Sequence, residues 1–240
     1  MSQSLTPQAL AAMIDHTFLK PFGGPEPIEK LCAEARQYGF AMVAINPAEV
    51  AACVRLLARS PVRVGAAIGF PLGQNTPEVK AFETRDAIAR GAGEIDMVIN
   101  IRALQSGDHA LVRGEIESMA ALCREAGVIS KVILETCYLT DEEKVLVCQM
   151  SKAAGADFVK TSTGFSTCGD RCRLQTIVAS SLPFSPMFVA RGHTWLELQG
   201  LRPRPTKAYS CSPSRRSQGA SLSRFSQLRP RRRSLVRKTG

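Results

Sequence analysis

The chain has 240 residues, of which 45% are hydrophobic, and its mean hydropathy is close to zero. This length and composition fit one large globular domain, because single barrel domains commonly reach about 250 residues. No apolar run approaches the roughly 18 residues that cross a bilayer, and the first residues lack the basic start and apolar core of a signal peptide. The sequence therefore predicts a cytoplasmic protein.

The formal net charge of +10 is concentrated at one end of the chain. Residues 166–240 contain 15 Lys and Arg against 2 Asp and Glu, whereas residues 1–165 contain 16 against 19. A basic chain often binds nucleic acid, but this segment has little aromatic interleaving and no recognised nucleic-acid-binding module. We expect only nonspecific attraction between its arginines and polyanions.

The eight cysteines are scattered, without the paired spacing or neighbouring histidines that a zinc site needs. Cys168 and Cys172 are the closest pair, but no second pair accompanies them. The sequence predicts reduced, mostly buried thiols and no metal site.

Up to residue 160, short apolar runs rich in Val, Ile and Ala alternate with segments of helical periodicity, which is typical of βα units and a parallel sheet. Thr6 and Pro7 open a short helix that runs to about Met13, as N-cap and first helical residue. Strands are predicted at residues 14–18, 40–45, 62–69, 94–100, 131–135 and 157–160. Helices are predicted at residues 26–38, 48–59, 77–91, 108–126 and 141–154. The last helix starts with a capping box formed by Thr140 and Glu143.

This alternation ends after Gly164. Residues 166–240 contain 13 Arg and 12 Ser in proline-spaced clusters, and only LQTIVASSL, at 174–182, fits a helix or a strand. Such a segment buries too little apolar surface to offset the entropy of ordering it. The sequence therefore predicts an α/β fold of the (β/α)8 TIM-barrel type with six recognisable strands, in residues 1–165. Strands seven and eight are missing or replaced, and residues 166–240 form a largely disordered tail.

A parallel barrel presents its reactive side chains at the C-terminal ends of the strands. In EIDMVIN, the alternation of faces places Asp96 with Glu94 and Val98, opposite an apolar face that should meet the helices. Asp96 therefore points into the barrel, where a carboxylate must be paired or functional. The polar residues at or near predicted strand ends are Asp15, Thr17, Asn46, Asp96, Asn100, Glu135 and Lys160.

Lys160 is the candidate nucleophile. A lone lysine at a strand end usually reaches solvent, and this is the alternative interpretation of Lys160 when its neighbours are ignored. Its surroundings favour a reactive group, because it follows an apolar strand and precedes the small, hydroxyl-rich turn TSTGF. The backbone N–H groups of this turn, which includes Thr163 and Gly164, could approach a phosphate closely.

Five segments resemble deoxyribose-phosphate aldolases in order and spacing, over residues 5–165. They are IDHTFLKP (14–21), IGFPLG (68–73), GAGEIDMVINIRALQSGD (91–108), KVILETCYLTDEE (131–143) and FVKTSTGF (158–165). The resemblance implies a lyase, a class I aldolase that cleaves 2-deoxyribose 5-phosphate to glyceraldehyde 3-phosphate and acetaldehyde. It assigns the Schiff base to Lys160 and the proton relay to Asp96. Asp15, Thr17, Glu135, Thr163 and Gly164 take binding or supporting roles.

The resemblance also has implications for metals, cofactors and partners. No metal or cofactor is expected, because the protonated imine is itself the electron sink. The partners are the small-molecule substrates, and a homo-oligomer is compatible with the sequence.

The chain departs from the family after residue 165. Family members continue to a seventh strand whose lysine assists the first, and an eighth strand whose Gly/Ser turn holds the phosphate. Here the later lysines, Lys207 and Lys238, follow no strand pattern. Lys131, at the start of the predicted fifth strand and about 13 Å below the strand ends, is a poor substitute. The alternative is therefore a catalytically impaired barrel fragment from a frame-shifted gene, whose basic tail binds polyanions nonspecifically.

Overall fold

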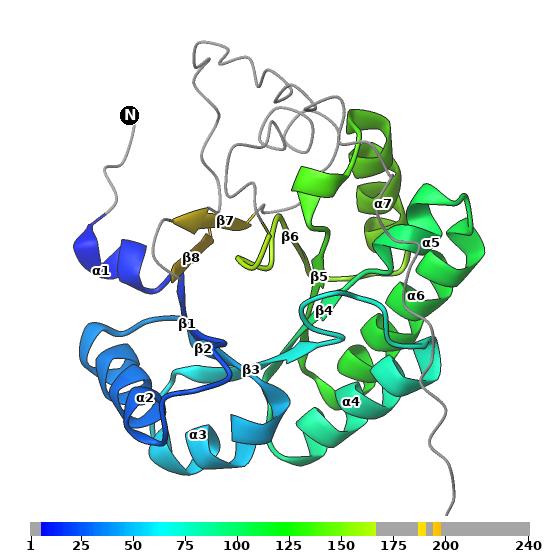
Figure 1. The fold of residues 1–240 in the computed structure, drawn as a ribbon. Helices are drawn as coiled ribbons and strands as arrows, with labels where there is room; N and C mark the ends of the chain where they lie inside the picture. Colours follow the sequence, from blue (N-terminus) through cyan, green and yellow to red (C-terminus); the bar gives the residue numbers. More distant parts are fainter. Residues whose placement is uncertain (1–5, 167–186, 191–193, 198–240) are drawn as a thin grey trace, which may run out of the picture. The chain divides into compact units, whose positions relative to one another are not determined.

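The computed structural model describes residues 6–166, 187–190 and 194–197. Within them, eight strands follow one another in sequence order around a closed barrel (Figure 1). The strands are β1 (Ile14–Phe18), β2 (Met42–Ile45), β3 (Arg63–Ile68), β4 (Glu94–Val98), β5 (Ile129–Ile133), β6 (Phe158–Lys160), β7 (Met187–Ala190) and β8 (Thr194–Glu197). The first six confirm the predicted parallel arrangement of βα units.

The helices of the βα units lie outside the barrel (Figure 1). They are α2 (Glu26–Tyr38), α3 (Val50–Leu56), α4 (Pro77–Ala89), α5 (Ile101–Gln105), α6 (His109–Ala126) and α7 (Asp141–Ala153). The helix α1 (Pro7–Ala11) precedes β1, and two short 3-10 helices, η1 (Pro47–Glu49) and η2 (Thr136–Tyr138), follow β2 and β5. The predicted caps are confirmed: Thr6 accepts the N–H of Ala9, and Thr140 and Glu143 form a capping box. The short helix α5 was not predicted from the sequence.

The last two strands form an antiparallel hairpin instead of two further βα units. β7 is parallel to β6, but β8 is antiparallel to both β7 and β1. The sequence predicted no strand here, because each strand has only four residues and no helical pattern separates them. The segment 174–182, Lys207 and Lys238 lie outside the described residues.

The strands β4 and β5 each end two residues earlier than predicted. β5 ends at Ile133, because Glu135 adopts a left-handed conformation (φ +51°) that a strand cannot contain. β4 ends at Val98, and Asn100 instead caps α5 by accepting the N–H of Ala103. The earlier ends place Lys131 in the middle of β5, directly opposite Asp96 on β4.

The sheet separates an apolar layer from a charged one. Between the strands and the outer helices lie fully buried side chains such as Ile95 and Met97 of β4 and Ile116 of α6. The buried charged residues of β1 to β6 are Asp15, Glu94, Asp96, Lys131 and Lys160. Among the described helices, none is long and apolar enough to cross a membrane. The five cysteines of this part of the chain are free thiols, and four of them are buried.

Candidate active site

Lys160 and Asp96 form a buried ion pair. Lys160 ends β6, and its Nζ lies 2.5 Å from Oδ2 of Asp96 on β4. The two residues are 2% exposed, so Lys160 does not reach solvent as a lone strand-end lysine would. The inward direction predicted for Asp96 is therefore confirmed by its contact across the barrel.

Lys131 is the second buried lysine of this site. Its Nζ lies 2.8 Å from Oδ2 of Asp15 and 3.9 Å from Oδ1 of Asp96, and it also contacts Oε1 of Glu94. Glu94 in turn accepts a hydrogen bond from Nε of Arg63. Asp96 thus lies between two ammonium groups, with Lys160 at one carboxylate oxygen and Lys131 near the other.

The sequence prediction that Lys131 lies far below the site is wrong. It rested on a fifth strand at residues 131–135, which would put Lys131 four residues before the strand end. Because β5 runs from Ile129 to Ile133, Lys131 is two residues from that end and has Asp96 as its register partner. A two-residue shift raises a side chain by about 7 Å along a strand.

Burial and charge act in opposite directions on these groups. Burial opposes the ionised form of Asp96, but Lys131 and Lys160 hold the pKa of its carboxyl group below the usual range. Burial likewise disfavours the charged form of Lys131, and the carboxylates of Asp15, Asp96 and Glu94 outweigh it and raise its pKa. Asp15 and Glu94 have raised pKa values, because for them burial outweighs the attraction of Lys131. The cluster therefore keeps a permanent cation beside an ionised Asp96.

Glu135 holds the turn that follows Lys160. Its Oε2 accepts hydrogen bonds from the backbone N–H of Thr163, at 2.9 Å, and from the hydroxyl of the same residue. Its Oε1 accepts the hydroxyl of Ser166 at 3.1 Å, and the N–H of Phe165 donates to Oγ1 of Thr163. Gly164 supplies the left-handed residue of the turn (φ +84°). Two amides of this turn already have acceptors, so a phosphate would have to displace those bonds.

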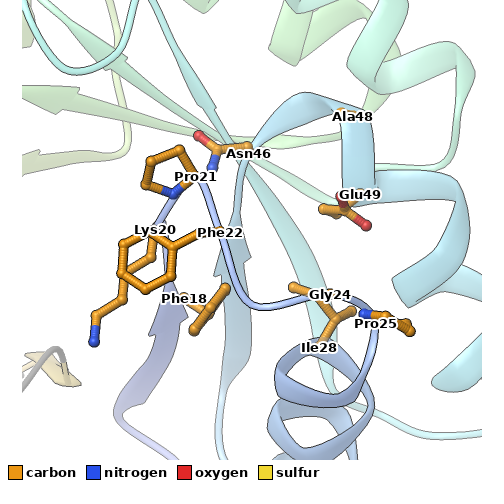
Figure 2. Close-up of a pocket in the computed structure, with 10 residues that line it drawn as sticks. All are labelled: Phe18, Lys20, Pro21, Phe22, Gly24, Pro25, Ile28, Asn46, Ala48 and Glu49. Carbon is orange, nitrogen blue, oxygen red and sulfur yellow. The ribbon is translucent and has the colours of Figure 1, made fainter.

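Three other predicted residues form hydrogen bonds with nearby backbone groups. Thr17 is buried beside Asp15 and donates its hydroxyl to the carbonyl of Asp15. Asn46 donates to the carbonyl of Leu19 and lines a pocket of about 420 Å³ between the segments that follow β1 and β2 (Figure 2). Asn100 is the cap of α5. The lining of that pocket contains neither buried lysine of the barrel, and it consists of Phe18, Lys20, Pro21, Phe22, Gly24, Pro25, Ile28, Asn46, Ala48 and Glu49.

The arrangement is suited to amine and proton chemistry. A buried amine that contacts an ionised carboxylate can form an imine with a carbonyl substrate and exchange protons with that carboxylate. Oδ1 of Asp96 is buried and has no hydrogen-bond donor among the described residues, although Lys131 lies 3.9 Å away. In the same residues, no group of three His, Cys, Asp or Glu side chains is arranged to hold a metal ion.

The model of the DeoC/LacD aldolase family matches residues 9–186, so the match extends past residue 165, where the resembling motifs end. A deoxyribose-phosphate aldolase of Bacteroides thetaiotaomicron is 73% identical over 166 residues, which are 69% of this chain and 70% of that protein. One of Clostridium perfringens is 57% identical over 162 residues, which are 68% of this chain and 72% of that protein.

Solved structures agree with the sequence relatives. A deoxyribose-phosphate aldolase from Coccidioides immitis, named as putative, superposes with a TM-score of 0.70 and 36% identity, over 75% of this chain and 72% of that one. The enzyme from Aeropyrum pernix, described as having a unique tetrameric structure, gives a TM-score of 0.67 and 35% identity, over 73% of each chain.

Proposed function

Because the chain belongs to the DeoC/LacD family of aldolases, we propose that it is a deoxyribose-phosphate aldolase that uses Lys160 as its Schiff-base lysine. The observation that carries the proposal is the buried pair of Lys160, the last residue of β6, and Asp96, which lies two residues before the end of β4. TIM-barrel enzymes hold their reacting groups at this end of the strands. The reaction is the reversible cleavage of 2-deoxyribose 5-phosphate to glyceraldehyde 3-phosphate and acetaldehyde.

The amine of Lys160 performs the covalent step. Its nitrogen adds to the aldehyde carbon of the open-chain sugar, and loss of water gives a protonated imine. The C2–C3 bond then breaks as the C3 hydroxyl loses its proton, and the bonding electrons move into the imine to form an enamine. Glyceraldehyde 3-phosphate leaves, the enamine carbon takes up a proton, and water releases acetaldehyde and the free lysine.

Asp96 moves the protons of these steps. Its Oδ2 touches the reacting nitrogen, so it can accept a proton from the amine adduct and return one when water leaves. Its Oδ1 is buried and has no hydrogen-bond donor among the residues that the structure describes, so it can accept a bond from a substrate hydroxyl or a water. Lys131 supplies the permanent positive charge next to this carboxylate, in the absence of the seventh-strand lysine that the family pattern contains.

Borohydride trapping tests the proposal directly. Incubation with acetaldehyde and sodium borohydride reduces any imine to a stable ethyl adduct, and peptide mass spectrometry locates it. We expect the adduct on Lys160, and none on Lys80, an equally buried lysine outside the barrel that serves as the internal control. A protein labelled only on surface lysines would reject the Schiff-base assignment and favour the alternative of an impaired barrel fragment.

The proposed partners are the sugar phosphate and the two aldehydes. A homo-oligomer is proposed by analogy with the tetrameric relative from Aeropyrum pernix, and light scattering tests it. Nonspecific polyanion binding is proposed only for the basic tail, residues 166–240, most of which lies outside the described residues. Retention on heparin that is undiminished after removal of residues 204–240, which hold 11 of the 15 Lys and Arg of this tail, would reject that assignment.

A further inference from the structure

A second buried ion pair lies outside the barrel and takes no part in the proposed chemistry. Lys80 of α4 and Glu115 of α6 are each 1% exposed, and Nζ of Lys80 lies 2.6 Å from Oε2 of Glu115. The two helices pack side by side against the outer face of the sheet (Figure 1). Replacing a buried ion pair by apolar residues of similar volume often leaves stability unchanged or improves it, so stability alone does not account for this pair.

Both members of the pair bind the backbone at the end of β4. Nζ of Lys80 donates to the carbonyl of Val98 at 2.9 Å, and Oε1 of Glu115 accepts the N–H of Asn100 at 2.6 Å. Val98 is the last residue of β4 and lies two residues after Asp96 on the same face of the strand. The pair therefore fixes the backbone next to the carboxylate that contacts Lys160.

The same helix also holds the end of β3. Gly69 has a left-handed conformation (φ +60°), and a Cβ there would lie 3.0 Å from Cε of Lys80. Its N–H donates to Oε2 of Glu83, one turn further along α4. The absence of a side chain at Gly69 thus lets the stem of Lys80 run close to the strand ends.

We infer that Lys80 and Glu115 are positioning residues, which hold the end of β4 so that Asp96 meets Lys160 in the geometry that proton transfer requires. This inference rests on the proposed function for its kinetic consequences, but its geometric claim stands on the contacts of Val98 and Asn100. Displacement of a reacting group by about 1 Å can lower turnover as much as 100-fold. A small movement of β4 is therefore enough to impair the reaction.

The decisive variant is Lys80→Met with Glu115→Leu, which fills the volume of the pair and removes its bonds to the backbone. We expect a lower melting temperature, because the carbonyl of Val98 and the N–H of Asn100 lose these partners, and a kcat lower by about 10- to 100-fold with little change in KM. Glu115→Gln keeps a single carbonyl oxygen, so it can accept from the N–H of Asn100 or from Lys80 but not from both at their present positions, and its kcat should lie between those of the wild type and the double variant. A double variant with the kcat of the wild type overturns the inference.

Arg124→Met is the matched control. Arg124 is also on α6 and donates to a backbone carbonyl, that of Ala154, which is the C-cap of α7. Its loss should lower the melting temperature without changing kcat. An equal loss of kcat in Arg124→Met and in the double variant would mean that any loosening of α6 impairs the enzyme, and would contradict a specific role for the pair.

A second pair of variants covers the case in which the double variant does not fold. Asn100→Pro removes the N–H that Glu115 accepts, at a residue whose φ of −77° suits proline, whereas Asn100→Ala removes only the side-chain cap. We expect kcat to fall further in Asn100→Pro than in Asn100→Ala. Equal values would overturn the inference.

A crystal structure separates this inference from the proposed function. The distance between Nζ of Lys160 and Oδ2 of Asp96, 2.5 Å here, should increase in the double variant or in Asn100→Pro. This readout requires no activity. A wild-type protein that fails the trapping test rejects the proposed function alone, whereas an unchanged distance rejects the positioning role alone.

Discussion

Two lysines of this protein have the same exposure and opposite pKa shifts. Lys131 inside the barrel and Lys80 outside it are each 1% exposed, and for both the largest influence is burial, which disfavours the charged form. Lys131 faces three carboxylates, and its pKa is raised. Lys80 faces Glu115 closely and Glu83 more weakly, and its pKa is lowered. The number of carboxylates around a buried amine thus decides the direction in which its pKa shifts.

This difference separates two uses of buried charge. Inside the barrel, three carboxylates keep Lys131 charged, and it holds a fixed cation beside Asp96 at the place where protons are to move. Outside the barrel, the pair of Lys80 and Glu115 directs its hydrogen bonds to backbone groups of β4. We expect the cluster around Lys131 to take part in proton transfer, and the pair of Lys80 and Glu115 to hold Asp96 in position.

The largest effect is expected for Lys131→Met. This change leaves Asp15, Glu94 and Asp96 without their shared cation, and removal of one partner of a buried ion pair costs about 3–5 kcal/mol. Urea unfolding should show at least this loss in the free energy of unfolding. A loss below about 1 kcal/mol, the range of exposed ion pairs, would show that the carboxylates do not depend on Lys131.

Asp96→Asn should reduce turnover by about 10²- to 10⁴-fold, the usual contribution of a general acid–base group. The amide keeps the shape of the side chain, so the fold should remain intact, but Lys160 loses its buried carboxylate partner and the unfolding midpoint should fall. The matched change outside the barrel is Glu115→Gln, which turns one acceptor of the pair into an N–H₂ group facing a buried donor, and it should lower stability and reduce turnover less than Asp96→Asn does. Equal turnover in the two variants would remove the distinction between the clusters.

The sequence predicted much of this site because its signals are local. Strand alternation alone turned Asp96 inward, the motif FVKTSTGF identified Lys160, and Thr140 with Glu143 identified the start of α7. The position of Lys131 along the barrel axis depends on where β5 ends. That end is set by the left-handed backbone of Glu135, which no local sequence pattern indicates. The pair of Lys80 and Glu115 gave no signal either, because the two residues are 35 positions apart in the sequence and lie on different helices. Sequence periodicity does not predict which residues of different elements come into contact in the folded chain.

Alkaline pH should affect the two lysines in opposite directions. The folded pKa of Lys80 lies below its unfolded value, so between that folded pKa and about 10.4 the unfolded chain binds more protons and the contribution of Lys80 to stability rises with pH. The folded pKa of Lys131 is raised, so its contribution is complete below about 10.4 and falls as the pH rises further.

The measurement compares unfolding free energies of Lys80→Met and Lys131→Met with the wild type from pH 8 to 11. The difference between the wild type and Lys80→Met should grow in favour of the wild type as the pH approaches about 10.4, whereas the difference for Lys131→Met should stay level there and shrink above it. Parallel curves for the two variants would mean that the surrounding carboxylates do not control these amines.

The smallest effect is expected for Thr140→Ala. This change serves as the reference, because Thr140 belongs neither to the cluster around Lys131 nor to the pair of Lys80 and Glu115. Thr140 accepts the N–H of Glu143, and the side chain of Glu143 accepts the N–H of Thr140, so the capping box holds only the first turn of α7. Loss of such a cap costs about 1 kcal/mol. Thermal unfolding should therefore shift by a few degrees while kcat and the yield of trapped Lys160 stay at wild-type values. If this change lowers kcat as much as the substitution of Lys80 and Glu115 does, turnover follows stability in general, and the contacts of β4 have no special part in placing Asp96.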